Sequence, residues 1–164
     1  MKYFAYGSNL NVGQMQWRCR NAVPLGPYTL QGYQLVFRFY ADIAPAPGKS
    51  VKGGLWDITD EHEELLDRYE GYPDLYGKYY EDDIMFYRMR EDAYDLRLPT
   101  LGYLGDMLEG MENFGFSALE DLNKNLGNPP SQDIEEEGDL LQNAMRLIAE
   151  SMGIDLIKET SMAI

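Results

Sequence analysis

The sequence predicts an α+β fold: a small, mostly antiparallel β-barrel with flanking helices, followed by a C-terminal helix. Three observations support this prediction. Strand-like stretches fill most of the chain up to about residue 107, one short helical pattern interrupts them, and a longer amphipathic pattern comes last. Strands and helices occur in runs instead of alternating, which is typical of α+β proteins. The length of 164 residues suits a single domain.

The first strand is expected at residues 2–6, where aromatic residues precede Gly7. Either Asn9 or Asn11 could then cap a short helix that continues through Trp17, because an Asn side chain accepts hydrogen bonds from the free amides of a first helical turn. This prediction places a polar Gly-Ser-Asn turn between a buried strand and a helix.

Two further strands are expected around a loop. Residues 23–30 are punctuated by Pro and Gly, and residues 32–40 are rich in the aromatic and β-branched residues typical of a strand. Residues 41–50 have the composition of a loop. Residues 51–59 predict another strand, in which a pair of glycines allows a bulge or a close backbone contact.

A short helix is expected after these strands. Thr59 or Asp60 can cap it, acidic residues fill its first turn, and Gly71 and Pro73 end it. Its apolar stripe contains Leu65, Leu66 and Tyr69.

The remaining chain divides into strands and a more acidic part. Residues 75–89 and 98–107 read as two further strands or strand pairs, which complete a barrel core over residues 1–110. Residues 111–164 are turn-rich and acidic, include an amphipathic helix at 133–153, and are expected to pack on the same domain. The apolar stripe of this helix packs on the barrel or forms a dimer interface, so a monomer or a homodimer is expected. It contains Leu140, Leu141, Ala144, Met145, Ile148 and Met152.

Composition and charge exclude several classes of function. A net charge of −14 argues against nucleic acid and against anionic membranes. No stretch approaches the roughly 20 apolar residues of a membrane span, and the N-terminus lacks the pattern of a signal peptide. Cys19 is the only cysteine, so no internal disulfide can form, which suits a cytoplasmic protein. With His62 as the only histidine and no calcium-loop spacing, no metal site is expected.

Glu70, at the end of the predicted short helix, is the first candidate catalytic residue. A carboxylate there faces the negative end of the helix dipole, which is unfavourable unless another requirement keeps it in place. A Gly-Tyr-Pro turn follows at once and fixes its position. Its neighbours Tyr69, Tyr72 and Tyr76 form a setting of low polarity that raises a carboxyl pKa toward a range useful for proton transfer. The alternative is a solvated acid at a helix end.

The Gly-Ser-Asn turn at residues 7–9 is the second candidate feature. Successive backbone amides near a helix N-terminus can converge on a carboxylate or an oxyanion, and the side chains of Ser8 and Asn9 add donors. The alternative is a turn that only reverses the chain. Neither feature is specific alone, so the interpretation depends on their occurring together.

Four other polar residues each have two interpretations. Cys19 could be a nucleophile, but its only possible imidazole partner, His62, lies at an acidic helix start that reads as exposed, so a buried small hydrophobe is favoured. Asp42 is either an acid in a turn at a strand end or a pocket-lining residue. Arg18 and Arg20 either attract an anionic substrate or form surface ion pairs.

Three stretches together resemble the gamma-glutamylcyclotransferase-like family. They are YFAYGSNLNVGQMQWRC from residue 3, GYQLVFRFYADIAPAPGKSVKGGLWDIT from residue 32 and LLDRYEGYPDLYGKYY from residue 65. The resemblance runs from about residue 2 to about residue 107, in order and with matching spacing, whereas the last third departs from the family pattern. It implies a β-barrel core with flanking helices.

The resemblance also implies a site and an activity. In this family, the Tyr-Gly-Ser-Asn-Leu turn binds the α-carboxylate of a γ-glutamyl group across a cavity from a glutamate that acts as acid and base, here Glu70. The substrate-binding residues implied are Tyr6, Gly7, Ser8, Asn9, Leu10, Tyr76 and Tyr103. The expected partner is a small-molecule γ-glutamyl substrate, from which 5-oxoproline and an amine or amino acid are released.

The chemistry explains why one carboxyl group would suffice. The α-amine attacks the γ-carbonyl within the same molecule, and well-oriented intramolecular attack reaches effective molarities of about 10⁵ M or more. Neither a cofactor nor a covalent enzyme nucleophile is then required. Two other functions stay open: a non-catalytic module that holds a small anionic ligand in the same pocket, and an interaction protein that uses the acidic C-terminal helix.

Overall fold

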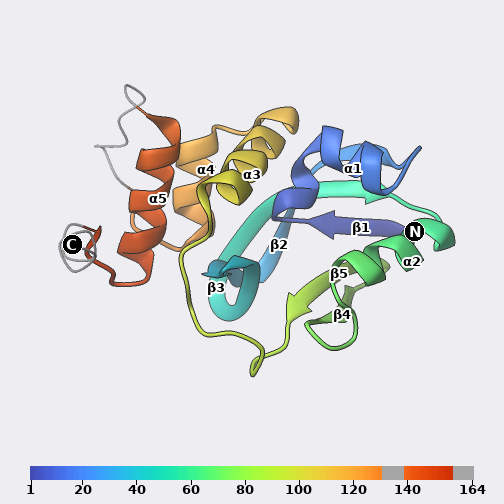
Figure 1. Ribbon diagram of the computed structural model, residues 1–164, viewed down its shortest axis with the longest axis horizontal. Coiled ribbons are helices and arrows are strands. Elements are labelled where there is room, and N and C mark those ends of the chain that lie inside the picture. The colour runs from blue at the N-terminus through green and yellow to red at the C-terminus, as the bar shows by residue number, and fades with distance from the viewer. Residues whose placement is uncertain (131–138, 157–164) are drawn as a thin grey trace.

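The computed structural model describes residues 1–130 and 139–156, and these contain one five-stranded sheet (Figure 1). The strands are β1 (Lys2–Ala5), β2 (Val23–Arg38), β3 (Tyr40–Asp57), β4 (Tyr76–Glu81) and β5 (Ile84–Met89). Their order in the sheet is β2-β3-β1-β5-β4, and every neighbouring pair is antiparallel except β1 with β5. The α+β class and the mostly antiparallel pairing are confirmed, but the sheet is open, so the predicted barrel is not closed.

The longest pairing in the sheet is the β2–β3 hairpin, which corrects two predictions. Residues 23–30, which Pro and Gly punctuate, and residues 41–50, expected as a loop, are both strand, and β2 pairs with β3 from Val23↔Asp57 to Arg38↔Tyr40. Their prolines are tolerated because β2 is an edge strand and because β1 covers only the last four residues of β3, Gly54–Asp57. An uncovered edge needs no amide donor from a proline.

The helices are η1 (Ser8–Leu10), α1 (Val12–Arg18), α2 (Asp60–Tyr69), α3 (Leu101–Asn113), α4 (Ala118–Asn125) and α5 (Leu140–Ser151). Helices α3, α4 and α5 gather beyond β2 and β3, whereas α1 and α2 lie toward the other end of the molecule (Figure 1). The predicted caps are confirmed for two helices: the side chain of Asn11 accepts from Gln14 N in α1, and that of Thr59 accepts from His62 N in α2. The ring of His62 completes this capping box and is buried, so its expected exposure is wrong.

Helix α3 replaces the strand predicted at 98–107. Thr100 caps it by accepting a hydrogen bond from Tyr103 N, and its buried residues recur with helical spacing. They are Leu104, Met107, Leu108, Gly110 and Met111. The helix runs across residue 110, the boundary expected between the barrel core and the divergent part.

The divergent part is more helical than the sequence suggests. Helix α4 occupies part of the predicted acidic loop, and α5 lies within the predicted helix 133–153, whose residues up to 138 fall outside the described ones. Helix α5 packs on α3 and α4 through a face on which Ala144 and Ile148 are buried. Part of the apolar stripe therefore packs on α3 and α4, whereas Leu140 is exposed.

Gly110 brings α3 against the turn that follows β1. A Cβ atom at this position would lie 2.4 Å from both the Leu10 carbonyl carbon and the Asn11 amide nitrogen. Asn11 in turn donates from Nδ2 to the Asp106 carbonyl oxygen and to Glu109 Oε2, each at 3.0 Å. The turn between β1 and α1 is thus held by α3, through residues up to the expected boundary at residue 110.

Candidate active site

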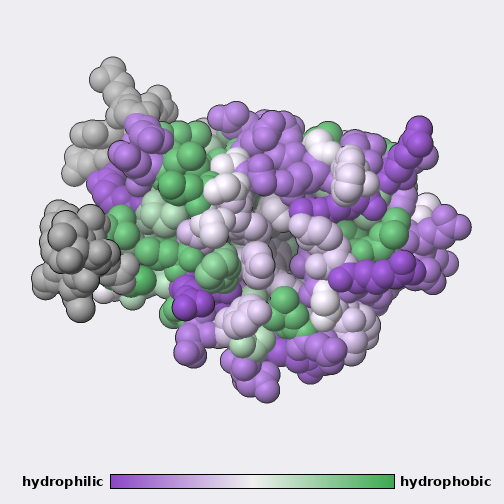
Figure 2. Space-filling model, in the orientation of Figure 1, coloured by the Kyte–Doolittle hydropathy of each residue, from purple (hydrophilic) through white to green (hydrophobic). Residues whose placement is uncertain are grey.

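A cavity of about 190 Å³ lies where the C-terminal end of β1, the end of α2 and the start of β3 approach one another. Figure 2 shows a hollow near the middle of this face, bordered by pale residues of intermediate hydropathy. The cavity is lined by Tyr3, Tyr6, Gly7, Ser8, Asn9, Tyr40, Ala41, Tyr69, Glu70, Leu75, Tyr76, Tyr87 and Tyr103. The sequence-predicted turn and the predicted glutamate therefore lie on one cavity.

Gly7 ends β1 and begins the turn. Leu10 N donates to the Gly7 carbonyl oxygen at 3.1 Å and Asn11 N to that of Ser8 at 3.0 Å, which forms the single turn of η1. A Cβ atom on Gly7 would lie 2.9 Å from the Tyr103 hydroxyl oxygen and 3.0 Å from Ala41 Cβ. Glycine is therefore required here by close packing between the turn and two other walls of the cavity.

Asn9 joins this turn to α2. Its Nδ2 donates to Glu70 Oε1 at 3.0 Å and to the Tyr3 hydroxyl at 2.9 Å, and its carbonyl oxygen accepts from Trp56 Nε1 at 3.0 Å. The Asn9 side chain is buried, so these bonds are shielded from water. Residues 61 positions apart in the sequence are thereby fixed in direct contact.

Glu70 is the C-cap of α2, the residue directly after Tyr69. Its amide still donates a helical hydrogen bond of 2.8 Å to the Leu66 carbonyl oxygen. Gly71 follows with a φ of 65°, a left-handed conformation that ends the helix and that glycine adopts readily. Burial raises the pKa of the Glu70 carboxyl to about 7, although the charge of Arg18 and the hydrogen bond from Asn9 oppose this rise. A carboxyl with this pKa can both accept and return a proton near neutral pH.

Tyrosine hydroxyls form much of the cavity wall. Tyr76 donates to the Ala41 carbonyl oxygen at 2.9 Å, and Tyr6 donates to that of Tyr87 at 2.7 Å. The Tyr103 hydroxyl accepts from Ala41 N at 3.1 Å and is also hydrogen-bonded to the backbone and the side chain of Ser8. Burial raises the pKa of Tyr6 and Tyr76 well above its usual value and that of Tyr103 to about 12, so these hydroxyls stay protonated.

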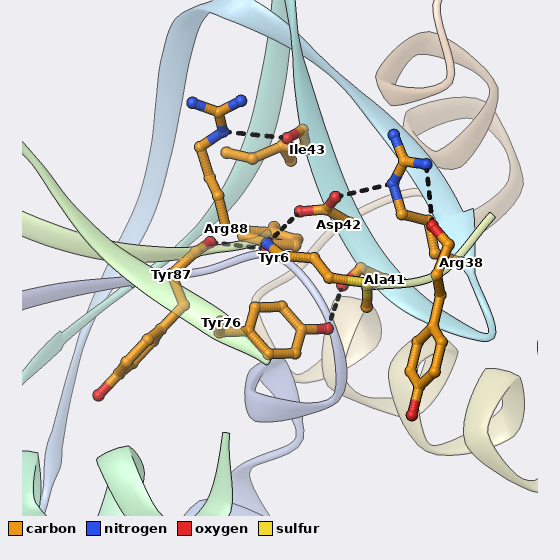
Figure 3. A network of polar contacts seen from close by, with 10 residues as sticks. Tyr6, Arg38, Ala41, Asp42, Ile43, Tyr76, Tyr87 and Arg88 are labelled. Atoms are coloured by element: carbon orange, nitrogen blue, oxygen red, sulfur yellow. Dashed lines mark hydrogen bonds and ion pairs between the residues drawn. The ribbon is translucent and has the colours of Figure 1, made fainter. Parts of the chain in front are cut away.

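Asp42 lies behind the cavity wall and does not line the cavity (Figure 3). Its Oδ1 accepts from Met89 N at 2.8 Å and its Oδ2 pairs with Arg38 Nε at 3.1 Å. Asp42 is buried and ties the start of β3 to the end of β5, two strands that do not pair in the sheet. Between β3 and β5, the hydrogen bonds of the Asp42 side chain thus take the place of backbone pairing behind the cavity wall.

Six of the seven predicted substrate-binding residues line the cavity, and the seventh, Leu10, is buried in the hydrophobic core instead. Sequence reasoning missed several lining residues, which are Tyr3, Tyr40, Ala41, Leu75 and Tyr87. Tyr3 could have been predicted from the sequence, because it lies on the strand that leads into the turn. Tyr87 could not have been predicted, because its position beside Glu70 depends on how β5 pairs with β1.

The other candidates identified in the sequence can now be placed. Cys19 is buried and its thiol points to the His62 carbonyl oxygen at 3.7 Å, as expected for a small core residue. Burial raises its pKa, which disfavours the thiolate. Arg18 is half-buried and donates to Asn9 Oδ1, while Arg20 is exposed. Neither arginine forms an ion pair with a described residue, so the second of their two interpretations, a surface ion pair, is not found among these residues.

The described residues contain neither a helix that could span a membrane nor a cluster of metal-binding side chains. None of the helices in 1–130 and 139–156 is long and apolar enough to cross a membrane. Within the same ranges, no three His, Cys, Asp or Glu side chains are grouped so that they could hold a metal ion.

The sequence pattern of the family described as gamma-glutamyl cyclotransferase, AIG2-like, matches residues 3–92, more than half of the chain. The chain therefore belongs to this family, which confirms the resemblance noted in its motifs. Both the Gly-Ser-Asn turn and Glu70 lie within the matched residues. Helices α3, α4 and α5 lie beyond them.

Solved structures share the fold. One named gamma-glutamyl cyclotransferase has a TM-score of 0.64 and 22% identity, over 88% of this chain and 97% of that chain. An uncharacterized protein from Homo sapiens gives the same values. YkqA from Bacillus subtilis has a TM-score of 0.58 and 21% identity, over 70% of this chain and 49% of its own. No curated protein sequence matches this chain.

Proposed function

We propose that this protein is a γ-glutamyl cyclotransferase that releases 5-oxoproline and an amine or amino acid from a small γ-glutamyl substrate. The observation that carries the proposal is the 3.0 Å hydrogen bond from Asn9 Nδ2 to Glu70 Oε1, which joins the Gly-Ser-Asn turn to the glutamate on one cavity. Membership of the cyclotransferase family supports the class of reaction.

In the proposed reaction, Glu70 acts as base and then as acid. The ionised carboxylate takes a proton from the α-ammonium of the substrate, and the freed amine attacks the γ-carbonyl carbon to form the ring C–N bond. The ring nitrogen loses its second ammonium proton as the ring closes. The bond from the γ-carbon to the leaving nitrogen then breaks while Glu70 returns the first proton to this nitrogen, so that the amine leaves as an ammonium carrying both protons. General acid–base catalysis of this kind contributes about 10²–10⁴-fold to the rate.

The other predicted residues would bind and orient the substrate. The turn of Gly7, Ser8 and Asn9 is proposed to hold the α-carboxylate, while the side chains of Tyr76 and Tyr103 are proposed to form the wall beside the γ-carbonyl group. Leu10 would contribute through the shape of the turn, because its side chain is in the core. Tyr6 is proposed to hold the wall through its bond to β5.

The dimensions of the cavity support a small substrate. Pockets for drug-sized ligands measure about 300–1,000 Å³, whereas this cavity is about 190 Å³. That space suits a curled glutamyl group with the leaving group directed toward the opening, where Tyr69 and Tyr40 are partly exposed.

The test is release of 5-oxoproline from γ-glutamyl-alanine and from γ-glutamyl-ethylamide, measured by chromatography. The Glu70→Gln variant should lose about 10²–10⁴-fold in kcat and remain folded. The matched control is Glu64→Gln, which removes the same charge from an exposed position of α2. Release from neither substrate, or equal release by wild type and Glu70→Gln, would contradict the proposal. A ligand that binds stoichiometrically and is recovered unchanged would favour the binding module.

A further inference from the structure

Arg18, at the end of α1, contacts three residues of the cavity wall. One guanidinium nitrogen, Nη1, donates to Asn9 Oδ1 and lies 3.4 Å from Ser8 Oγ, while Nη2 donates to the Tyr69 hydroxyl. The guanidinium carbon lies 3.5 Å from the centre of the Tyr69 ring. The guanidinium therefore bridges the Gly-Ser-Asn turn and the C-terminal end of α2.

We propose that Arg18 is a positioning residue that sets the orientation of the Asn9 amide, so that Asn9 Nδ2 donates to Glu70 and favours its carboxylate form. The inference rests on the proposed function, because it assigns Arg18 a part in preparing the proposed base. It concerns a residue that touches Asn9 and not the reacting atoms.

The argument starts from the two ends of an asparagine amide. The nitrogen can only donate and the oxygen can only accept. With Asn9 Nδ2 toward Glu70, the amide suits an ionised carboxylate. If the amide were reversed, its oxygen would face Glu70 and would suit the protonated carboxylic acid instead.

Arg18 selects between these two orientations. Because a guanidinium has donors and no acceptor, it requires the oxygen of the Asn9 amide on its own side. The Tyr3 hydroxyl, 2.9 Å from Nδ2, can donate or accept and so does not decide between them. The charged donor therefore fixes the nitrogen toward Glu70.

Arg18 also acts on Glu70 by its charge. The titratable groups that face Glu70 from β1, β4, β5 and α3 are tyrosines whose pKa is raised by burial, so they are neutral near pH 7. They are Tyr3, Tyr6, Tyr76, Tyr87 and Tyr103. Asp42 faces Tyr6 and Tyr76, and Arg18 is the cation that lowers the pKa of Glu70. Without Arg18, both the charge and the amide orientation would shift toward the protonated carboxyl.

The test compares Arg18→Gln with Arg20→Gln, which removes the same charge from an exposed position two residues away. The rate of 5-oxoproline release from γ-glutamyl-alanine and γ-glutamyl-ethylamide is measured from pH 5 to 9. In Arg18→Gln, the midpoint of the rise in kcat/KM should move up by about one pH unit, with a loss of about tenfold below the midpoint. The loss should be the same for both substrates, and Arg20→Gln should behave like wild type.

Arg18→Lys provides a second variant that keeps the charge. Its midpoint should lie between those of wild type and Arg18→Gln, because an ammonium retains the charge but not the planar fork that contacts Asn9 and Tyr69 together. An unchanged midpoint in Arg18→Gln would overturn the inference. A loss confined to γ-glutamyl-alanine would also overturn it, because the guanidinium would then bind the carboxylate of the leaving group.

A measurement without turnover separates this inference from the proposed function. Titration of the Glu70 carboxyl carbon by NMR in isotopically labelled protein should show a higher pKa in Arg18→Gln than in wild type or Arg20→Gln. If wild type released no 5-oxoproline but this shift occurred, the proposed function would fail while the positioning by Arg18 stood. Equal titration of Glu70 in all three proteins would overturn the positioning.

Discussion

Two carboxyl groups lie close to the same cavity, and they differ in exposure and in how many hydrogen-bond partners they have: Asp42 is buried, whereas Glu70 is only partly buried. Asp42 accepts hydrogen bonds at both oxygens, from Met89 N and from Arg38, and lies behind the wall. Glu70 accepts one bond, from Asn9 to Oε1, and lines the cavity. Burial raises the pKa of both groups. A raised pKa alone therefore does not distinguish the proposed catalytic carboxyl from the structural one. What distinguishes them is that Glu70 has unused hydrogen-bonding capacity and lines the cavity.

Asp42→Ala tests the structural side of this comparison and should have the largest effect on stability. The change leaves Met89 N without its partner and Arg38 without its counter-ion, so the free energy of unfolding should fall by about 3 kcal/mol. Urea unfolding measures it, with Asp83→Ala, an exposed acid on the β4–β5 turn, as control. If both variants lost less than about 0.5 kcal/mol, Asp42 would not hold β3 to β5.

The ionised Glu70 carboxylate should reduce the stability of the folded protein, and this effect should depend on pH. Its pKa is about 4.5 when unfolded and about 7 when folded, so the folded protein favours the protonated carboxyl. As the pH rises through this window, wild type should lose about 2–3 kcal/mol of stability relative to Glu70→Gln. Unfolding of both proteins at pH 5 and pH 8 measures the difference. A constant difference between the two pH values would mean that burial does not raise this pKa.

Tyr76→Phe tests the residue that lies between the two acids. It removes the donor to the Ala41 carbonyl oxygen, which should cost about 1 kcal/mol of stability. The exposed Tyr80→Phe is the matched control. If Tyr76→Phe also moved the pH midpoint of activity, the two carboxyl groups would be coupled through this ring, and their separation into one structural and one reactive group would be wrong.

The parts of the fold that could be predicted are those with local signals. The Asn11 and Thr59 caps, the β4–β5 hairpin and the α2 stop at Gly71 all depend on neighbouring residues. The stretch 41–50 was misread because its prolines and glycine are typical of loops, whereas partner strand β2 supplies its hydrogen bonds on one side. Only the order of the strands in the sheet reveals that no second strand pairs with this stretch on its other side, so that its prolines need not donate hydrogen bonds there.

The residues of the candidate site likewise divide into those that local sequence patterns predict and those that they do not. Glu70 and the Gly-Ser-Asn turn carry motifs that the sequence displays, so both could be predicted, and the structure brings them together. The segment of Tyr103 was expected to be a strand, because glycines and an aromatic residue hide the helical spacing of α3. Tyr87 reaches the site through strand pairing, which no local pattern encodes. Arg18 could be named as a candidate from the sequence, but its contact with Asn9 could not.

Tyr103 belongs to α3, outside the residues that match the family pattern, yet it contacts the turn at Gly7 and the amide of Ala41. During synthesis, the turn and glutamate motifs therefore emerge from the ribosome before α3, which completes the wall of the cavity. The proposed reaction would have to wait until α3 has left the exit tunnel and docked. A fragment cut to the matched residues alone would keep every signature motif and still lack one wall of the chamber in which the chemistry is proposed to occur.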